Sequence, residues 1–418
     1  MRKFYAVVVK RAKLLLAIAG VAVCAAAVVL TASLLSNAAV PVTTGTGAYT
    51  ILAMNDLGMH CIQRDYSAYL LLPPANTLKV QVIQKGTHEA RLVSAGIRVT
   101  YEIIDNTTSD DKTNFWKYAK DYGFDAAPNV GITGNGLSGE FALSADGKYY
   151  EAAAIPVTPY NDGSDQLNPY QLARIRVMDA RTGAVLAETS NVVVPVSDEM
   201  NCGSCHGQTN TDLAILTTHD KLSGTSLVKS LENGERYKCG QCHRDNALGL
   251  PGKADVPPLS QAMHGFHADK MDSVSTSPVC YTCHPGPITK CYRGQMAKEG
   301  VTCGSDECHG DMTNVAKTQA EGRQAWLEEP DCGKCHGEKY AVNAGQLYRN
   351  SYLRNAPGEG MNDLILCASC HNSPHGEWVS EQPKDNLLPH SLLGYDSFID
   401  KCTVCHEGEG RVHRGNSS

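Results

Sequence analysis

One pentapeptide, Cys-x-x-Cys-His, occurs six times in the second half of this 418-residue chain. The copies begin at Cys202, Cys239, Cys280, Cys332, Cys367 and Cys402. The composition would produce about 0.02 such motifs by chance, so the repetition is not accidental. This spacing is the attachment signature of c-type haem, because two thiols add to the vinyl groups of one porphyrin and the next histidine reaches the iron. The sequence therefore predicts a region built around covalently attached haem.

A seventh, wider motif runs from Cys303 to Cys308-His309, with four residues between the thiols instead of two. The extra residues can bulge outward without moving the Cys308-His309 anchor, so we interpret it as a stretched haem site. The alternative is a single thioether with Cys303 free. The predicted thioether cysteines are Cys202, Cys205, Cys239, Cys242, Cys280, Cys283, Cys303, Cys308, Cys332, Cys335, Cys367, Cys370, Cys402 and Cys405. The predicted proximal iron ligands are His206, His243, His284, His309, His336, His371 and His406.

Zinc and simple disulfides are the competing interpretations of these motifs. A structural zinc site needs paired Cys-x-x-Cys units that close a four-ligand tetrahedron. Seven cysteine pairs, each with its own histidine, do not divide into such sites. Disulfides would explain the cysteines but not the histidine after every second one. Seven haem c groups are therefore the predicted cofactors.

The N-terminus has the pattern of an export signal. Basic residues up to Lys13 precede a charge-free apolar run from Leu14 to about Leu35, which is followed by Ser36-Asn37-Ala38-Ala39. The small residues favour cleavage after Ala38 or Ala39, although the apolar run is also long enough to remain as a membrane anchor. In both cases the positive flank stays inside and the haem region is exported to the periplasm or the cell exterior.

Composition divides the exported chain into two regions. Between about Gly47 and Val196 there is one cysteine, and alternating β-branched and aromatic stretches predict strands at 77–84, 92–104, 149–157, 172–178 and 185–196. Six or more short strands separated by turns favour an all-β sandwich of immunoglobulin-like type. From Asn201 onward apolar residues become fewer, which predicts coil and short helices around a haem array. The expected regions are 1–38 (signal or anchor), 39–198 (β-sandwich) and 199–418 (heptahaem region).

The histidines outside the motifs are the candidates for the distal iron ligands. The haem region contains six histidines outside the motifs: His219, His264, His267, His375, His390 and His413. They nearly match the seven haems, which favours axial ligation for the set. We expect the seventh ligand to be His60, which lies in an apolar, turn-rich run, rather than His88 in a predicted hairpin turn. A histidine from a neighbouring chain, or a methionine such as Met263 or Met296, is the alternative.

Two cysteines of the exported chain lie outside the motifs, Cys61 and Cys291. Two leftover thiols in an oxidising compartment pair more often than they stay free. The sequence therefore predicts a Cys61 to Cys291 disulfide that joins the sandwich to the haem region. Two unrelated buried thiols are the alternative.

The motif series, the wide Cys303 site and Met263-His264-Gly265-Phe266-His267-Ala268 resemble the multihaem c-type cytochromes of bacteria and archaea that respire extracellular acceptors. The resemblance covers about residues 200 to 418. The run from Asn55 to Cys61 and the following residues up to Thr77 also resemble a module that precedes the haem region in such exported proteins. Some members of the broader group polymerise into haem-stacked filaments, sometimes with a histidine donated between subunits.

This resemblance implies bis-histidine, low-spin haems in near contact, between which electrons hop without a substrate pocket. The expected partners are redox cytochromes or extracellular acceptors, with possible self-association into filaments. The alternative is a multihaem oxidoreductase of nitrite or hydroxylamine type with one open haem face. Every motif ends in histidine, which disfavours it. A formal net charge of -7 argues against nucleic acid as a partner.

Overall fold

The computed structural model describes residues 47–86, 90–271, 274–306, 308–328, 332–337, 339–341, 352–353 and 364–407. The predicted export segment, His88 and His413 lie outside these ranges. The described residues belong to one compact unit with mixed α and β content. The last long strand, β11 (Val185–Ser197), ends just before the first Cys-x-x-Cys-His motif.

The first of two five-stranded sheets has β1 (Tyr49–Asn55) beside β4 (Asn76–Gln84), followed by β9 (Tyr150–Ile155) and β8 (Ala142–Leu143). The short β5 (Arg91–Leu92) also pairs with β4. All pairings in this sheet are antiparallel. β1 and β4 are buried along almost their whole length, as expected of strands covered on both faces.

The second sheet has the order β2 (His60–Cys61), β11, β10 (Tyr170–Asp179), β6 (Ile97–Ile104) and β7 (Ser138–Glu140). β2 lies parallel to the end of β11, and the other pairings are antiparallel. In β6 and β10 buried and partly exposed residues alternate, because successive side chains of a strand point to opposite faces.

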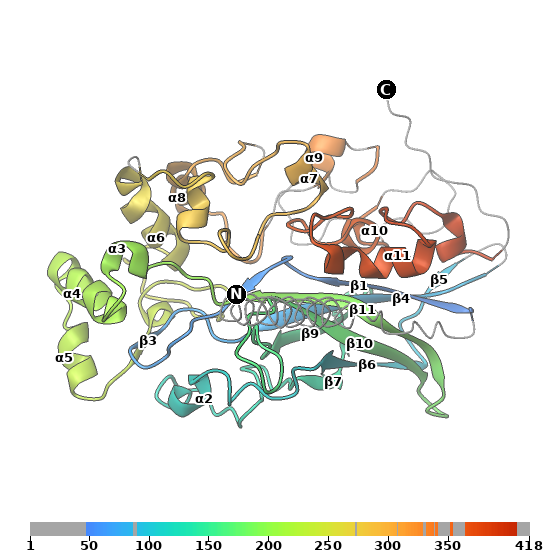
Figure 1. Cartoon of the computed structure of the whole chain (residues 1–418), viewed down its shortest axis with the longest axis horizontal. Coiled ribbons are helices and arrows are strands. Elements are labelled where there is room, and N and C mark those ends of the chain that lie inside the picture. Colours follow the sequence, from blue (N-terminus) through green and yellow to red (C-terminus); the bar gives the residue numbers. More distant parts are fainter. Residues whose placement is uncertain are drawn as a thin grey trace, which may run out of the picture. The chain divides into compact units, whose positions relative to one another are not determined.

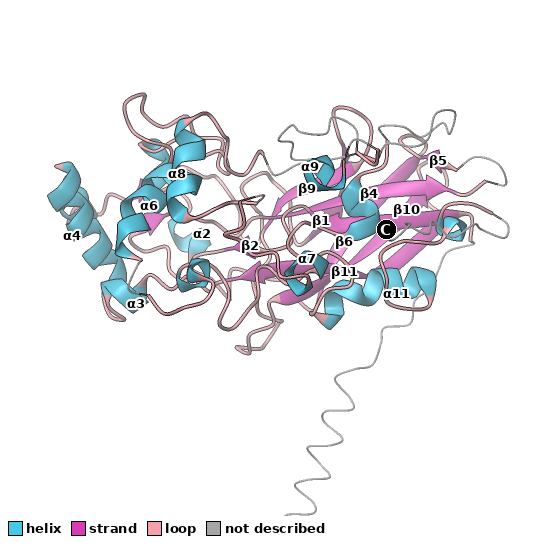
Figure 2. Ribbon diagram, turned by 90° about the horizontal axis from the view of Figure 1, so that it is seen from above, coloured by secondary structure: helices cyan, strands magenta, loops and turns pink. Residues whose placement is uncertain are grey.

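One hydrophobic core contains side chains from both sheets. β1 and β4 contribute Ile51 and Val80, while β6 and β10 contribute Tyr101 and Ile175. The two sheets therefore share their buried faces, and Figures 1 and 2 show the strands gathered in one part of the molecule. Beside them, Tyr66 and Phe115 form a smaller aromatic cluster next to the single turn α2 (Phe115–Tyr118).

The second half consists mainly of short helices and turns, as expected from its composition. The longest helix in the described part of this half is α4 (Thr211–Ser223), of 13 residues. The other helices outside the motifs are α5 (Leu227–Glu232), α6 (Leu259–His267), α7 (Gln295–Lys298), α8 (Met312–Ala320) and α11 (Leu387–Leu393), with 3-10 turns η2 (Ala268–Lys270) and η4 (Pro383–Asn386). A two-residue strand, β12 (Tyr237–Lys238), pairs with β3 (Tyr69–Leu70).

The two ends of this half are packed differently. Trp378 and Leu388 belong to the core shared by the sheets, and α11 contacts β11. In Figure 1 α10 (Cys367–His371) and α11 lie along the side of the sheets that carries β1, β4 and β11. In contrast, α5, α6 and α7 have no fully buried side chain. The described residues around α5 to α7 thus bury little apolar surface by themselves.

Candidate functional site

The regular Cys-x-x-Cys-His motifs all fold as single turns. Three are 3-10 turns, η1 (Cys239–Gln241), η3 (Val279–Thr282) and η5 (Cys402–Val404), and three are α-helical, α3 (Gly203–His206), α9 (Cys332–His336) and α10. In four motifs the backbone N–H of the histidine donates to the carbonyl of the first cysteine, at 2.8–3.0 Å. These motifs begin at Cys202, Cys239, Cys280 and Cys402. The turn brings both thiols and the imidazole of each motif close together. We number the sites 1 to 7 by their histidines: His206, His243, His284, His309, His336, His371 and His406.

The wide motif of site 4 closes in the same way. The N–H of His309 donates to the carbonyl of Cys303 at 3.3 Å, although two more residues lie between them than in the regular motifs. The extra length is taken up by a turn in which the N–H groups of Cys308 and Gly310 both donate to Ser305. This geometry agrees with an outward bulge and an unmoved anchor.

Four motif histidines each face a histidine from outside the motifs. The pairs, with the distances between their ring centres, are His206 and His267 (6.4 Å), His243 and His219 (6.3 Å), His284 and His264 (6.0 Å), and His309 and His375 (6.3 Å). If two imidazoles bind opposite faces of one metal ion at about 2.0 Å, with each ring centre about 1.2 Å behind its nitrogen, their centres lie about 6.4 Å apart. The four separations fit a shared iron between each pair. These residues therefore fit a haem with two axial histidines.

The distal histidines of these pairs are oriented through Nδ1. Nδ1 of His264 donates to the carbonyl of Ser260 at 2.7 Å, and Nδ1 of His267 donates to that of Met263 at 2.8 Å. The equivalent bond of His375 goes to the carbonyl of Leu57, at 2.6 Å. A carbonyl can only accept, so each of these rings carries a proton on Nδ1, and in the neutral ring the lone pair then lies on Nε2.

The remaining pair follows the same arrangement. Nδ1 of His243 donates to the carbonyl of Pro257 at 2.8 Å, and Nδ1 of His219 lies 2.9 Å from the hydroxyl of Thr225. His390, which is exposed on α11, has Nδ1 2.7 Å from a carboxylate oxygen of Asp396. Of the six predicted distal histidines in the haem region, the five in the described residues thus keep Nε2 available.

Burial favours the neutral form of His284 and His309, which is the form that binds a metal. Burial, with the charges of His264 and His375 as smaller causes, lowers the pKa of His284 to about 4. Burial, followed by His375 and Arg323, lowers the pKa of His309 to about 3. Proton competition for these nitrogens is therefore small at neutral pH.

The segment from Asn55 to Cys61 contacts His375 and holds its ring in one orientation. The side chain of Asn55 accepts from the N–H of Gly58 at 2.6 Å and so fixes the turn whose Leu57 carbonyl binds His375. Gly58 has φ +86°, and a Cβ there would lie 3.0 Å from the Cβ of His375. Arg293 donates to the Gly58 carbonyl from the other side. The turn-rich composition of this run could have predicted a turn, but not its contact with a histidine far along the chain.

His60 differs from the other candidates in the ring nitrogen that is hydrogen-bonded. Its Nε2 lies 2.6 Å from a carboxylate oxygen of Asp56, and the side chain is buried. In the other candidates the hydrogen-bonded nitrogen is Nδ1. His60 as the seventh distal ligand stays a prediction.

Cys61 and Cys291 are free thiols in the structure, and they are neighbours. Burial, followed by the charges of Cys291 and Glu199, raises the pKa of Cys61, while burial raises that of Cys291 to about 11. The two neighbouring thiols thus lie in the segments that the predicted disulfide would link, which are β2 and the segment before Arg293.

Sites 5 to 7 lie in the C-terminal part. The ring of His371 stacks on Phe398, with centres 4.9 Å apart, and burial with the charge of His336 lowers its pKa. His406 is fixed by a backbone bridge to Gly86. Sequence reasoning did not indicate Phe398, because an aromatic residue without a motif carries no signal.

Several buried polar atoms of the haem half have no hydrogen-bond partner within the described residues. They are Nε of Arg244, Oγ1 of Thr282, the hydroxyl of Tyr292 and both carboxylate oxygens of Glu377. Arg244 and Thr282 belong to or directly follow motifs, and Tyr292 packs edge-on against His375 at 6.2 Å between ring centres. Buried polar groups usually have partners, so the unpartnered atoms of Arg244 and Thr282 fit a polar group bound beside their motifs.

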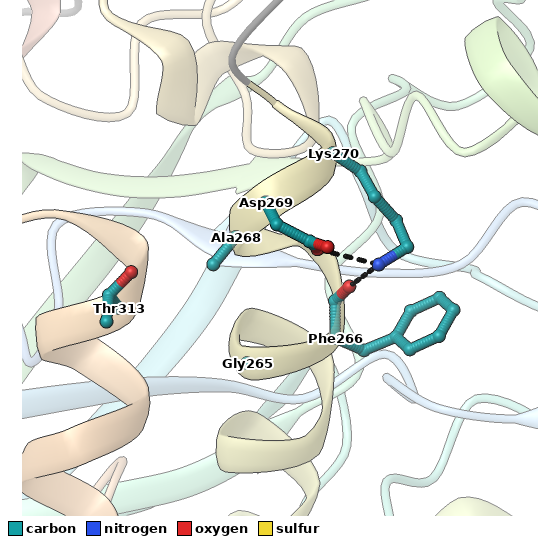
Figure 3. Close-up of a pocket in the computed structure, with 6 residues that line it drawn as sticks. All are labelled: Gly265, Phe266, Ala268, Asp269, Lys270 and Thr313. Carbon is teal, nitrogen blue, oxygen red and sulfur yellow. Dashed lines mark hydrogen bonds and ion pairs between the residues drawn. The ribbon is translucent and has the colours of Figure 1, made fainter.

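One open recess lies beside α6. It is lined by Gly265, Phe266, Ala268, Asp269, Lys270 and Thr313 (Figure 3). At its edge Lys270 donates to Asp269 and to the Phe266 carbonyl, at 2.7 Å each. No group of three or more histidine, cysteine, aspartate or glutamate side chains within the described residues is arranged to hold a bare metal ion, and no helix among them is long and apolar enough to cross a membrane.

Comparison with family models, with curated proteins and with solved structures found no match. The functional interpretation therefore rests on the motifs and their geometry.

Proposed function

We propose that this chain is an exported electron-transfer protein that holds seven c-type haems, with two axial histidines at most or all of them. The single observation that carries the proposal is the set of four histidine pairs at 6.0–6.4 Å between ring centres. Each pair joins a motif histidine to a histidine from outside the motifs. When bound, haem supplies one-electron redox chemistry at its iron.

The residues of the chain would attach the haems, orient the axial ligands and shield the haems from solvent. The two cysteines of each motif would form thioethers, and the following histidine would occupy the proximal side. Backbone carbonyls hold three of the four paired distal rings and the hydroxyl of Thr225 holds the fourth, so each ligand would be oriented before metal arrives. Iron with two imidazole ligands has no open position for a small molecule, which favours an electron carrier over an enzyme.

A multihaem oxidoreductase is the second candidate. Within the described residues, the ring contacts of His371 are with Phe398 rather than with another histidine. One of sites 5 to 7 would have to keep an open distal face for this function. His390, with Nε2 available, and His413, outside the described residues, remain the proposed ligands for this part of the chain.

The rest of the proposal concerns the sheets and the partners. We propose that the two sheets form an immunoglobulin-like sandwich that supports the haem region and contacts redox partner cytochromes or extracellular acceptors. Self-association into filaments, with a ligand donated between subunits, belongs to the same proposal. No nucleic acid is expected to bind.

Two measurements on the purified, haem-loaded protein test the function. Intact mass should show seven attached haems, and electron paramagnetic resonance (EPR) of the oxidised protein should show only low-spin ferric haem. A mass without haem would contradict the cofactor assignment. A high-spin signal equivalent to one haem would favour the oxidoreductase instead.

A further inference from the structure

The distal histidine of site 2 is held by a side chain instead of a backbone carbonyl. At sites 1, 3 and 4 the closest partner of the distal Nδ1 is a carbonyl oxygen. At site 2 Nδ1 of His219 lies 2.9 Å from the hydroxyl of Thr225, and this hydroxyl donates to a carboxylate oxygen of Asp220 at 2.6 Å. We propose that Thr225 and Asp220 form a relay that orients His219 and lowers the reduction potential of the site 2 haem. The inference rests on the proposed function, because it concerns a haem that the motif at Cys239 would hold.

The direction of the two hydrogen bonds follows from the available protons. Thr225 has one hydroxyl proton, and an ionised carboxylate can only accept. The two oxygens of Asp220 also accept from the backbone N–H groups of Leu227 and Val228, at 2.7 and 2.9 Å. The hydroxyl proton therefore points to Asp220, which leaves the oxygen of Thr225 to accept from Nδ1 of His219. In the neutral ring the lone pair of His219 then lies on Nε2, as in the distal rings of sites 1, 3 and 4.

The turn between α4 and α5 brings these groups together. α4 ends at Gly224, which has φ +65° and whose N–H donates to the carbonyl of Asp220 at 3.0 Å. A left-handed residue at this position ends the helix and turns the chain back. Thr225 is thereby returned to the last turns of α4, which carry His219 and Asp220. The first turn of α5 holds the Asp220 carboxylate through its N–H groups.

A relay of this kind changes the electron density of the metal ligand. A hydroxyl that donates to a carboxylate is a stronger acceptor, because hydrogen bonds in a chain polarise one another. The N–H of His219 is then polarised towards Thr225, and the ring becomes a stronger donor to iron. Stronger donation and the negative charge of Asp220 both favour ferric over ferrous haem, which lowers the reduction potential. The ring of His219 pairs with that of His243, with 6.3 Å between centres, so the effect would act on one haem.

Removing the hydroxyl while keeping the size of the side chain tests the relay. Thr225→Val removes it and Thr225→Ser keeps it. The matched control is Thr218→Val, because the hydroxyl of Thr218 precedes His219 by one residue but donates to the carbonyl of Ala214, at 2.8 Å. All three are made as full chains, loaded with haem and checked by mass for seven haems.

The expected result is a change in one haem of one variant. In Thr225→Val, redox titration should show one haem of higher potential, whose ferric-to-ferrous ratio at a fixed potential falls about two- to tenfold. The low-spin EPR signal of one haem should change with it. Thr225→Ser and Thr218→Val should keep the wild-type potentials and spectra.

Two further variants test how the hydroxyl acts. In the His219→Ala background site 2 has lost its distal ligand, so adding Thr225→Val should change no potential further. A further shift would overturn the action through His219. Asp220→Asn should raise the potential of the same haem as Thr225→Val, because an uncharged amide polarises the hydroxyl less. Wild-type potentials in Asp220→Asn would overturn the role of Asp220.

Equal potentials in Thr225→Val and Thr218→Val would overturn the relay, and so would a Thr225→Ser variant that behaves like Thr225→Val. If Thr225→Val does not fold, a density map of the haem-loaded wild type decides. The relay requires Oγ1 of Thr225 within hydrogen-bonding distance of both Nδ1 of His219 and the Asp220 carboxylate, and a water molecule in its place would overturn it. A wild type that carries no haem would instead refute the proposed function, so the two failures are distinguishable.

Discussion

Nδ1 of His375 lies 2.6 Å from the carbonyl oxygen of Leu57, although 318 residues separate them in the sequence. The contact joins a turn of the β region to the distal histidine of site 4. The β region thus helps to orient the histidine that we propose as a haem ligand, in addition to providing a surface on which the C-terminal helices pack.

The substitution Gly58→Ala should disturb site 4 specifically. The new Cβ would lie 3.0 Å from the Cβ of His375 and 3.1 Å from Oγ of Ser373, at a backbone φ of +86°. We expect a shifted potential and a changed low-spin EPR signal for one haem, together with a backbone cost of about 1–2 kcal/mol in the free energy of unfolding.

The matched control for this prediction is Gly96→Ala. Gly96 also has a positive φ, +74°, but a Cβ there would meet nothing within 4 Å. It should lower the free energy of unfolding by a similar amount without changing any haem signal. Equal spectra for the two variants would refute the positioning role of the turn.

The buried ion pair between Arg293 and Asp385 should be the main polar contact that stabilises the junction between the sheets and the C-terminal helices. Both side chains are at most 1% exposed, with Nε of Arg293 2.7 Å from the Asp385 carboxylate. Because Arg293→Met leaves a buried carboxylate unpaired, we expect a loss of about 3–5 kcal/mol in the free energy of unfolding.

The neighbouring pair of Lys290 and Glu381 supplies the control. Its side chains are 58% and 44% exposed, so Lys290→Met should cost at most about 1 kcal/mol. Denaturant unfolding of the haem-loaded proteins measures both values. Similar losses in the two variants would contradict the structural role of Arg293.

The wide motif should carry two thioethers. In Cys303→Ala the haem of site 4 should stay attached through Cys308, and one vinyl group should become free, which shifts the haemochrome absorption of one haem. Alkylation of the denatured wild type should leave Cys303 unmodified. An alkylated Cys303 in the wild type, and an unchanged spectrum in the variant, would instead establish a single thioether.

His390 and His60 should differ in their effect on the haems. Because Nε2 of His390 is available and Nε2 of His60 contacts Asp56, His390→Ala should convert one ferric haem from low to high spin, and His60→Gln should convert none. EPR of the oxidised variants measures this. A high-spin haem in His60→Gln would confirm His60 as the seventh distal ligand.

The predicted disulfide is tested by mapping the thiols of the exported protein. Cys61 and Cys291 are close but unbonded in the structure. In an oxidising compartment we expect a peptide in which the two are linked, and reduction should lower the free energy of unfolding by about 2–4 kcal/mol. Quantitative alkylation of both cysteines without reduction would contradict the prediction.

The sequence predicted the long strands better than the short ones. The expected ranges 77–84, 172–178 and 185–196 match β4, β10 and β11 closely, because period-two alternation and apolar runs are strong local signals. β1 was not among the expected ranges, because it is buried along almost its whole length and therefore does not alternate. The two-residue strand β2 pairs with the end of β11, far along the chain, and such pairing has no local signal.

For the proposed haem sites, too, local features could be predicted from the sequence and long-range contacts could not. The motif turns follow from covalent spacing within five residues, so they could be predicted individually. The distal partners could be predicted as a set, but not which histidine faces which site: His264 and His267 are three residues apart and face different sites. The Leu57 carbonyl could not be predicted at all, because a backbone oxygen leaves no trace in a sequence.

A density map of the purified, haem-loaded protein tests the central claim most directly. The account predicts an iron midway between the imidazoles of His206 and His267, and equally between the other three pairs. Each iron should be held by Nε2 of both rings, with Nδ1 of the distal ring on its present partner. Paired histidines that bind different irons, or rings in contact without iron between them, would contradict the account.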